Sequence, residues 1–493
     1  MSLYTSTRKN LENITATQAI LQGISEEGGL FVPVSIPKID FSFEEANSWD
    51  YKELAYRVMK LFYEDIKEQD LKRCIEQAYD EKFDDKEIAP LVVTRTANFL
   101  ELFHGPTIAF KDMALSILPH LMLVSKKYHK ESKDIVILTA TSGDTGKAAL
   151  EGFANVKGTK IIVFFPEEGV SEVQKRQMVT QEGENTLVVG VKGNFDDCQT
   201  AVKEIFADKA FEKEAADSNY KFSSANSINI GRLVPQVVYY FAAYSKLVKE
   251  GKLKNGEPMN VVVPTGNFGN ILAAYYAKDM GLPIKKFICA SNTNKVLCDF
   301  FEKGIYDRNR DFHLTISPSM DILISSNLER LLYHISGQDA KLVTDMMESL
   351  KNEGKYTITE NMKNKLSDFY GGYADDETTK AYIKQVYEND GYLMDTHTAV
   401  AYAVYDQYIR ETKDSVPSVI ISTASPYKFT SSVMTALGDQ YKNTDDFILL
   451  EEMHKLLKGD MPKAMNNIAT KPIKHKAVCE VSEMKDIVRN FLV

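Results

Sequence analysis

The chain has 493 residues, of which 44% are hydrophobic and 26% charged, the proportions of a folded protein and not of a disordered one. Its 69 acidic and 59 basic residues give a net charge of −10, which disfavours binding to a nucleic-acid backbone. No run of 18 apolar residues is present and the N-terminus lacks the apolar core of a signal peptide, so we expect neither a membrane span nor export. Five scattered cysteines, without CxxC or HExxH spacing, favour reduced thiols in the cytoplasm and no metal site.

Residues 1–95 predict an N-terminal, mainly helical domain. A Gly- and Pro-rich loop over 23–39 precedes two stretches in which apolar residues recur at helical spacing, 44–66 and 68–83. This helical spacing of apolar residues ends before the segment that begins near residue 96 and contains Lys111. We therefore expect the first 95 residues to be distinct from the part that follows.

From residue 134, short apolar runs alternate with helix-length segments. This alternation predicts parallel sheets covered on both faces, in an α/β fold. Residues 305–415 show no convincing strand and predict a helical insertion, and 440–493 fit a C-terminal helical cap. The expected lobes are a smaller one over 134–235 and a larger one from 96–133 with 236–493. The predicted strands are 134–140, 160–166, 186–191, 260–264, 286–290 and 418–424.

Two strand–turn–helix segments have the chemistry of anion sites. In 137–150, a helix beginning near Asp144 would direct its free N–H groups and positive dipole end outward from the strand. In 260–277, Gly266 and Gly269 would let the backbone approach a phosphate closely. Neither turn matches the P-loop or GxGxxG pattern, and either one alone is more often a plain α/β connection.

Lys111 follows the apolar run 108–110 and precedes a helical pattern, so we expect its amine in or beside a core. A buried ammonium must be paired, neutralised or used chemically. For a single lysine of this kind, the commoner outcome is pairing with Asp112 or another carboxylate, or extension of the amine to the surface. Together with two anion sites and a hydroxyl at a strand end, Thr423, a desolvated lysine suits a phosphate-bearing aldehyde. That description matches pyridoxal 5′-phosphate, which attaches to lysine as a Schiff base.

Segments found in the same order over most of the chain resemble the threonine synthase family, in its longer bacterial and fungal form. The resemblance implies the fold of the fold-type II pyridoxal-phosphate enzymes. That fold is like the tryptophan synthase β chain, with two parallel-sheet lobes and here a helical N-terminal region. The matching segments are YTSTR (4–8), GISEEGGLFVP (23–33), FHGPTIAFKD (103–112), TSGDTG (141–146), SANSINIGRLVPQ (224–236), PTGNFGN (264–270) and STASPYKF (422–429).

The resemblance implies a role for each matching residue. Lys111 would form the Schiff base and carry the substrate proton. The cofactor's phosphate, pyridine nitrogen and phenolic oxygen would be met by Gly266, Asn267, Phe268, Gly269, Asn270, Thr423 and Asp144. The substrate's carboxylate would lie at the start of the helix near Asp144, and its phosphate near a guanidinium suited to bidentate contact. The residues implied there are Ser142, Gly143, Thr145, Asn226, Ser227, Asn229 and Arg232.

The implied reaction converts O-phospho-L-homoserine and water into L-threonine and phosphate, the last step of threonine biosynthesis. Two alternatives stay open: a serine or threonine dehydratase on the same fold, and a cofactor- or metabolite-binding homologue without catalysis. Ser425 stands where the family commonly has His, and Lys428 either neutralises phosphate or is structural. A monomer and a homodimer are both compatible with the sequence.

Overall fold

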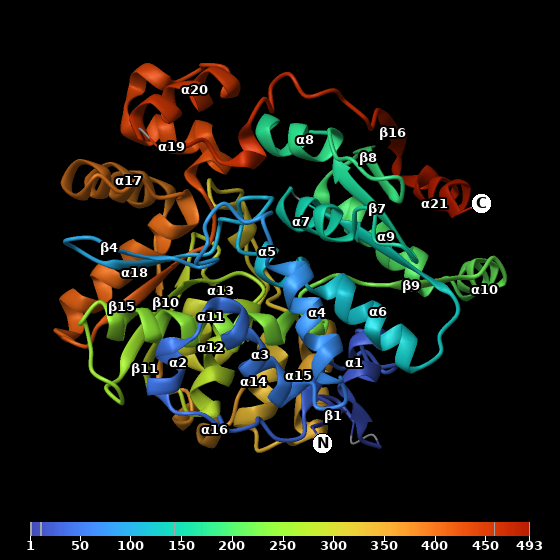
Figure 1. Cartoon of the computed structure of the whole chain (residues 1–493), viewed down its shortest axis with the longest axis horizontal. Helices are drawn as coiled ribbons and strands as arrows, with labels where there is room; N and C mark the ends of the chain where they lie inside the picture. Colours follow the sequence, from blue (N-terminus) through green and yellow to red (C-terminus); the bar gives the residue numbers. More distant parts are fainter. Residues whose placement is uncertain (1, 10–11, 142, 169, 458, 493) are drawn as a thin grey trace.

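Two mainly parallel β-sheets frame the structure (Figure 1). The computed structural model describes residues 2–9, 12–141, 143–168, 170–457 and 459–492. The larger sheet runs β14 (Phe369–Tyr373), β11 (Ile284–Ser291), β10 (Met259–Pro264), β15 (Ser418–Ser422), β5 (Asn98–Glu101) and β4 (Leu91–Val93), with β4 antiparallel to its neighbour. The smaller sheet is parallel and runs β16 (Ala477–Glu480), β8 (Thr186–Lys192), β7 (Thr159–Pro166), β6 (Asp134–Ala140) and β9 (Tyr220–Ser223).

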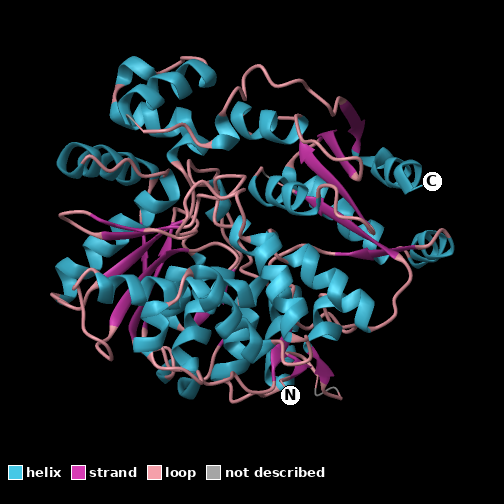
Figure 2. Ribbon diagram, viewed as in Figure 1, coloured by secondary structure: helices cyan, strands magenta, loops and turns pink. Residues whose placement is uncertain are grey.

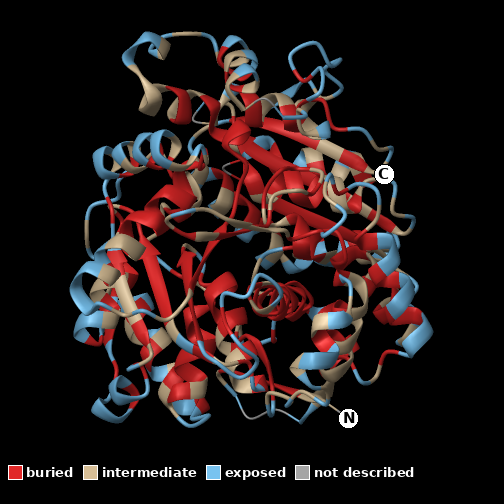
Figure 3. Ribbon diagram, turned by 60° about the vertical axis from the view of Figure 1, so that its left-hand side comes forward, coloured by how far each residue is buried: buried red, intermediate tan, exposed pale blue. Residues whose placement is uncertain are grey.

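Helices pack on both faces of each sheet, and the strands are apolar for that reason (Figures 2 and 3). In β6, Ile135 and Ile137 face the central core, whereas Val136 and Leu138 face an outer cluster. The central helix α11 (Ile230–Lys249) is buried along most of its length. The helices around the smaller sheet are α7 (Asp144–Phe153), α8 (Glu172–Val179), α9 (Phe195–Ala207), α10 (Lys209–Asp217) and α21 (Met484–Leu492).

The remaining helices belong to the N-terminal region and to the surroundings of the larger sheet. The N-terminal region combines α1 (Ala16–Gln22), α2 (Phe43–Ser48), α3 (Tyr51–Phe62) and α4 (Glu68–Ala78) with a small sheet of β2 (Ile14–Thr15), β1 (Leu3–Ser6) and β3 (Phe31–Pro33). The other helices are α5 (Asp112–Leu115), α6 (Leu118–Tyr128), α12 (Gly269–Met280), α13 (Val296–Lys303), α14 (Leu328–Ile335), α15 (Ala340–Asn352), α16 (Glu360–Asn364), α17 (Asp376–Asp390), α18 (Thr396–Thr412), α19 (Thr430–Leu437) and α20 (Asp446–Leu457). None of the helices in the described ranges is long and apolar enough to cross a membrane.

The predicted α/β class is confirmed, and all six predicted strands are present with bounds close to the expected ones. The prediction that 305–415 contains no strand is wrong. That segment contains the short pair β12 (Ile305–Asp307) and β13 (Lys355–Thr357), and β14, which extends the larger sheet. The sequence of β14, FYGGY, lacks the apolar pattern of a strand because glycines occupy two of its positions. Glycine is needed at position 371 because a Cβ there would lie 3.0 Å from the Cα of Cys298 in α13.

The C-terminal segment also differs from the prediction. The sequence prediction placed residues 440–493 in the larger lobe, within 236–493, and left their role open. Instead, β16 pairs in parallel with β8, and α21 packs against the smaller sheet. A four-residue strand in which only Cys479 is buried carries too weak an apolar pattern to be recognised from sequence.

Candidate active site

A cavity of about 430 Å³ lies where the carboxyl ends of β6, β10 and β15 meet, lined from both sheets. Open α/β sheets bind ligands at this edge because successive helices begin there and leave N–H groups free. Most of the predicted site residues line the cavity: Lys111, Thr145, Asn226, Ser227, Arg232, Gly266, Asn267, Phe268, Gly269, Asn270 and Thr423.

Among the described residues, two predicted substrate residues, Gly143 and Asn229, do not line the cavity. The amide of Asn229 is occupied in capping α11, donating to the carbonyl of Ile20 at 3.0 Å and accepting from the N–H of Gly231 at 2.9 Å. The N–H of Gly143 donates to Thr141 Oγ1 at 3.0 Å. Both groups are therefore engaged within the protein, and Ser142 lies outside the described residues.

Lys111 lies at the start of α5 with its amine facing the cavity. Its Nζ is 3.4 Å from Ser319 Oγ and 3.6 Å from Asp144 Oδ2, and the side chain is only 12% exposed. Burial lowers the pKa of Lys111 to about 8, against the opposing effect of Asp144. An amine with this pKa is far more available as a nucleophile or base near neutrality than an ordinary lysine.

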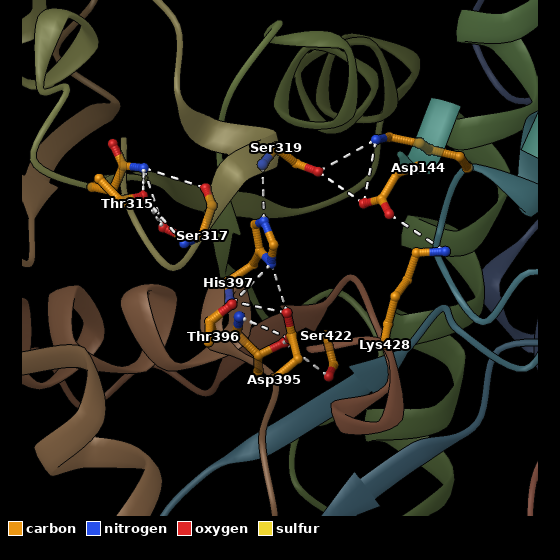
Figure 4. A network of polar contacts seen from close by, with 12 residues as sticks. Asp144, Thr315, Ser317, Ser319, Asp395, Thr396, His397, Ser422 and Lys428 are labelled. Carbon is orange, nitrogen blue, oxygen red and sulfur yellow. Dashed lines mark hydrogen bonds and ion pairs between the residues drawn. The ribbon is translucent and has the colours of Figure 1, made fainter. Parts of the chain in front are cut away.

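Asp144 is the first residue of α7 and connects two lysines (Figure 4). Its Oδ1 accepts a hydrogen bond from Gln174 at 2.8 Å and lies 3.4 Å from Lys428 Nζ, whereas Oδ2 faces Lys111. Burial alone would raise the pKa of this carboxyl, but Lys428 and Lys111 outweigh it and hold the pKa well below its usual range. The carboxylate therefore stays ionised.

Lys428 is fully buried and does not line the cavity. Its ammonium donates to the carbonyl of Thr107 at 2.9 Å and to Gln177 Oε1 at 3.2 Å, besides its ion pair with Asp144. Of the two roles that the sequence left open for Lys428, the geometry supports the structural one.

Asp144→Asn is expected to lower the free energy of unfolding by about 3 kcal/mol or more, because it leaves the buried ammonium of Lys428 without its carboxylate. Urea unfolding followed by circular dichroism measures this loss. The matched control is Asp134→Asn, which breaks the 2.9 Å pair with Lys126 at a half-exposed site and should cost less than about 1 kcal/mol. Equal losses in the two variants would contradict the structural role given to the buried pair.

The loop between β10 and α12 has the features of a phosphate site. Phe268 adopts a left-handed backbone with φ of 64°, and α12 begins directly after it. Asn270 Oδ1 accepts from the hydroxyls of Tyr239 and Tyr240 at 2.7 and 2.5 Å. Its Nδ2 is buried and has no partner among the described residues. An unpartnered donor beside a helix N-terminus suits an anionic acceptor.

Arg232 presents a second positive group to the same cavity. The side chain, on α11, is 4% exposed and donates to the carbonyl of Ala225 at 2.8 Å. No ion pair with a carboxylate is found for it within the described ranges, and burial lowers its pKa to about 10. A buried guanidinium with no counter-charge among the described residues suits an anionic ligand.

Two groups at the site were not foreseen from the sequence. Ser319, on the segment before α14, contacts both Lys111 and Asp144, and His397, near the start of α18, accepts a hydrogen bond from the Ser319 backbone. The available signal was the run Asp395-Thr396-His397 at a helix start, where the Asp is a helix cap and the His points inward.

Fold and site together define a pyridoxal-phosphate-dependent enzyme fold, and comparison with known families agrees. The model described as "Pyridoxal-phosphate dependent enzyme" matches residues 100–424. "Threonine synthase N terminus" matches 3–79, and "Threonine synthase, C-terminal" matches 398–488. The chain belongs to the threonine synthase family, and its cofactor is pyridoxal 5′-phosphate.

Individual relatives give the same family. Threonine synthase of Saccharomyces cerevisiae is 37% identical, over 92% of this chain and 93% of its own length. The pyridoxal-phosphate-bound threonine synthase of Brucella melitensis superposes with a TM-score of 0.87 at 36% identity, covering 100% of this chain and 99% of that one. The human protein named threonine synthase-like 1 is 43% identical over 85% of this chain, and this chain spans only 58% of that longer relative.

The residues present fit the cofactor. Lys111 is a buried amine with a lowered pKa, and Asn270 offers an unpartnered donor at the start of α12, about where a phosphate would be held. Gly266 is also required there, since a Cβ on it would lie 2.4 Å from the carbonyl oxygen of Ser319. The predicted cofactor is confirmed by the family, whereas the role of each residue toward it stays a prediction.

Proposed function

We propose that this protein converts O-phospho-L-homoserine and water into L-threonine and inorganic phosphate. The observation that carries this proposal is Arg232, a buried guanidinium facing the cavity with no carboxylate partner among the described residues. The loop at 264–270 supplies one place for a phosphate and Arg232 supplies another. Two phosphate groups are what a phosphorylated cofactor and a phosphorylated substrate bring together.

The chain's own residues divide the work around the reacting carbons. Lys111 takes the proton from Cα, because its amine has a lowered pKa and faces the cavity. Thr145, in the first turn of α7, receives the substrate carboxylate at the positive end of the helix dipole. When bound, pyridoxal phosphate delocalises the electrons released at Cα.

Arg232 acts at the other end of the substrate. A guanidinium can hold a phosphate by two parallel hydrogen bonds, which fixes the Cγ–O bond in the cavity. As phosphate leaves Cγ, its growing charge stays beside a fixed cation in a low-dielectric site. This departure requires the loss of a proton from Cβ, and phosphate takes the electron pair of the Cγ–O bond. A proton then returns to Cγ, and water adds its hydroxyl at Cβ and its proton at Cα. Thr423, which lines the cavity, would place a neutral hydroxyl at the cofactor's pyridine nitrogen, and this would disfavour transamination.

Product analysis tests the proposal directly. With O-phospho-L-homoserine, the cofactor-loaded protein should release phosphate and L-threonine in equal amounts, without ammonia. A dehydratase would instead release ammonia from L-serine or L-threonine, and a binding homologue would release neither product. The colorimetric phosphate assay and amino-acid analysis on one sample distinguish the three. Ammonia release from hydroxy amino acids, or cofactor binding without any turnover, would overturn the proposal.

A further inference from the structure

The segment 315–321 forms one wall of the cavity and is held rigidly from behind. Asp321 Oδ1 accepts from Asn292 at 2.7 Å and from the Thr315 hydroxyl at 2.8 Å. Asp321 Oδ2 accepts from the N–H of Thr315 at 3.0 Å. These bonds close the segment into a compact turn that contains a 3₁₀ helix over Pro318–Met320. Ser319, at the tip, is therefore presented to the cavity from a fixed backbone.

The hydroxyl of Ser319 joins Lys111 to Asp144. It accepts from Lys111 Nζ at 3.4 Å and donates to Asp144 Oδ2 at 2.9 Å. A hydroxyl can do both at once, since it has one proton and two lone pairs. Donation to an ionised carboxylate fixes the direction of the hydroxyl proton, which leaves a lone pair aimed at the lysine. Ser319 thus restricts the amine to one direction.

The backbone of Ser319 is in turn held by a histidine (Figure 4). The Ser319 N–H donates to His397 Nε2 at 3.1 Å, and His397 Nδ1 lies 2.7 Å from Asp395 Oδ2. An N–H can only donate, so Nε2 must be the ring nitrogen without a proton. Nδ1 therefore carries the proton and donates it to Asp395. The arrangement works with a neutral imidazole in this tautomer.

Asp395 has a second task that keeps it in place. It is fully buried, and its Oδ1 accepts from the N–H of Thr398 at 3.0 Å, which caps α18. The helix thereby fixes the carboxylate, the carboxylate fixes the imidazole, and the imidazole fixes the Ser319 backbone. A chain of this kind transmits the position of α18 to the amine of Lys111.

We propose that Ser319 is a positioning residue whose hydroxyl aims the Lys111 amine, and that His397 and Asp395 are positioning residues that set the place of Ser319. The inference rests on the proposed use of Lys111 and does not depend on which amino acid reacts. Nothing in the network requires a net proton transfer: Asp144 remains ionised and Ser319 remains a hydroxyl.

The first test measures the amine itself, in full-length protein freed of cofactor. The rate at which acetic anhydride acylates Lys111, read by peptide mass spectrometry against pH, reports its pKa. Ser319→Ala should lower the midpoint by about half a unit to one unit, because the ammonium form loses an acceptor. Asp144, Lys428 and Arg232 also act on the charge of Lys111, and this variant leaves all three in place.

Two companion variants calibrate that measurement. Ser319→Thr keeps the hydroxyl and should restore the midpoint, whereas Ser336→Ala, at the end of α14, should not move it. In the cofactor-loaded protein, Ser319→Ala should lower kcat about tenfold with a smaller change in KM. An unshifted acylation midpoint in Ser319→Ala would overturn the proposal even if turnover fell. If the wild-type protein formed no threonine, the midpoint shift would remain, and only the proposed function would be refuted.

The second test uses two aspartates that each cap a helix through the N–H three residues ahead; Asp395 also accepts from the N–H of His397 at 2.9 Å. Asp395→Asn retains an oxygen for the Thr398 N–H, but its amide group would donate to His397 Nδ1. That moves the ring proton to Nε2, where it faces the Ser319 N–H, and displaces Ser319. The control is Asp375→Asn, which caps α17 through Thr378 at 2.8 Å and has no histidine beside it.

Asp395→Asn should reproduce the midpoint shift of Ser319→Ala, and the double variant should add nothing further. Asp375→Asn should behave as wild type. A purely structural role for Asp395 would change the urea midpoint without moving the acylation midpoint of Lys111, and that outcome would refute the positioning role.

Discussion

Lys111→Ala is expected to abolish threonine formation, with a loss on the order of 10³-fold or more in kcat. The buried amine is the group in the cavity positioned both to attach the cofactor and to take the Cα proton. The methyl group of alanine can neither attach the cofactor nor accept the Cα proton. Phosphate release from O-phospho-L-homoserine measures the loss.

The same variant has a spectroscopic signature that does not require turnover. Wild-type protein should show near-visible absorbance of lysine-bound cofactor, and borohydride should fix the cofactor to the peptide containing Lys111. In Lys111→Ala neither should occur, although the loop around Asn270 can still bind the free cofactor. Lys126→Ala removes an ammonium that pairs with Asp134, and neither residue lines the cavity; this variant is the control and should behave as wild type. Borohydride fixation at a different lysine in wild-type protein would contradict the assignment.

The pH response of cofactor attachment follows from the same burial. Attachment needs the free amine, and the pKa of Lys111 is lowered to about 8. The rate of cofactor capture by the stripped protein should therefore rise as the pH passes through about 8, and level off well below the pH at which an exposed lysine deprotonates. A rate that kept rising to pH 10 would show that Lys111 is solvated and not desolvated.

The parts of the site that lie close together in sequence were predictable, because a strand, a Gly-rich turn and a helix each have a recognisable pattern within a few residues. The turns at Asp144 and at Gly266–Asn270 are of this kind, and the first of the two helices begins at Asp144, where it was expected. The apolar run 108–110 that precedes Lys111 predicted that its amine would lie in or beside a core. In the sheets, strands with buried β-branched runs were predictable for the same reason, whereas the glycine-rich β14 was not.

The parts made by distant segments were not predictable. Ser319 meets Lys111 across 208 residues and Asp144 across 175, with no local pattern at Ser319 itself. Asn229 shows what a matching motif leaves undecided: this polar residue caps α11 and donates to the carbonyl of Ile20, and its role toward substrate stays a prediction. Motif membership does not separate a side chain that faces the ligand from one that holds the backbone, because both lie a residue or two apart on the same turn.

Arg232→Leu is expected to lower kcat/KM for O-phospho-L-homoserine about 10²- to 10³-fold, through the loss of a desolvated, charge-assisted contact with phosphate. Inhibition by inorganic phosphate should weaken in parallel, whereas binding of unphosphorylated amino acids, measured by the change in cofactor absorbance, should alter little. Arg232→Lys keeps a positive charge but loses the bidentate geometry, so its kcat/KM should lie between those of the wild type and of Arg232→Leu. An equal loss for phosphorylated and unphosphorylated ligands would show that Arg232 shapes the cavity and does not recognise phosphate.

Stability supplies the decisive contrast for Arg232. Removing a buried charge that has a partner is destabilising, as expected for Asp144→Asn, because it strands the opposite charge. Among the described residues Arg232 has no carboxylate partner to strand, and burial already disfavours its charged form. Arg232→Leu should therefore unfold in urea at a concentration equal to or higher than wild type while losing its phosphorylated substrate. A buried charge that does not stabilise the fold is retained to bind a ligand. At this position, therefore, the substitution should raise or leave unchanged the free energy of unfolding while it lowers specificity for the phosphorylated substrate.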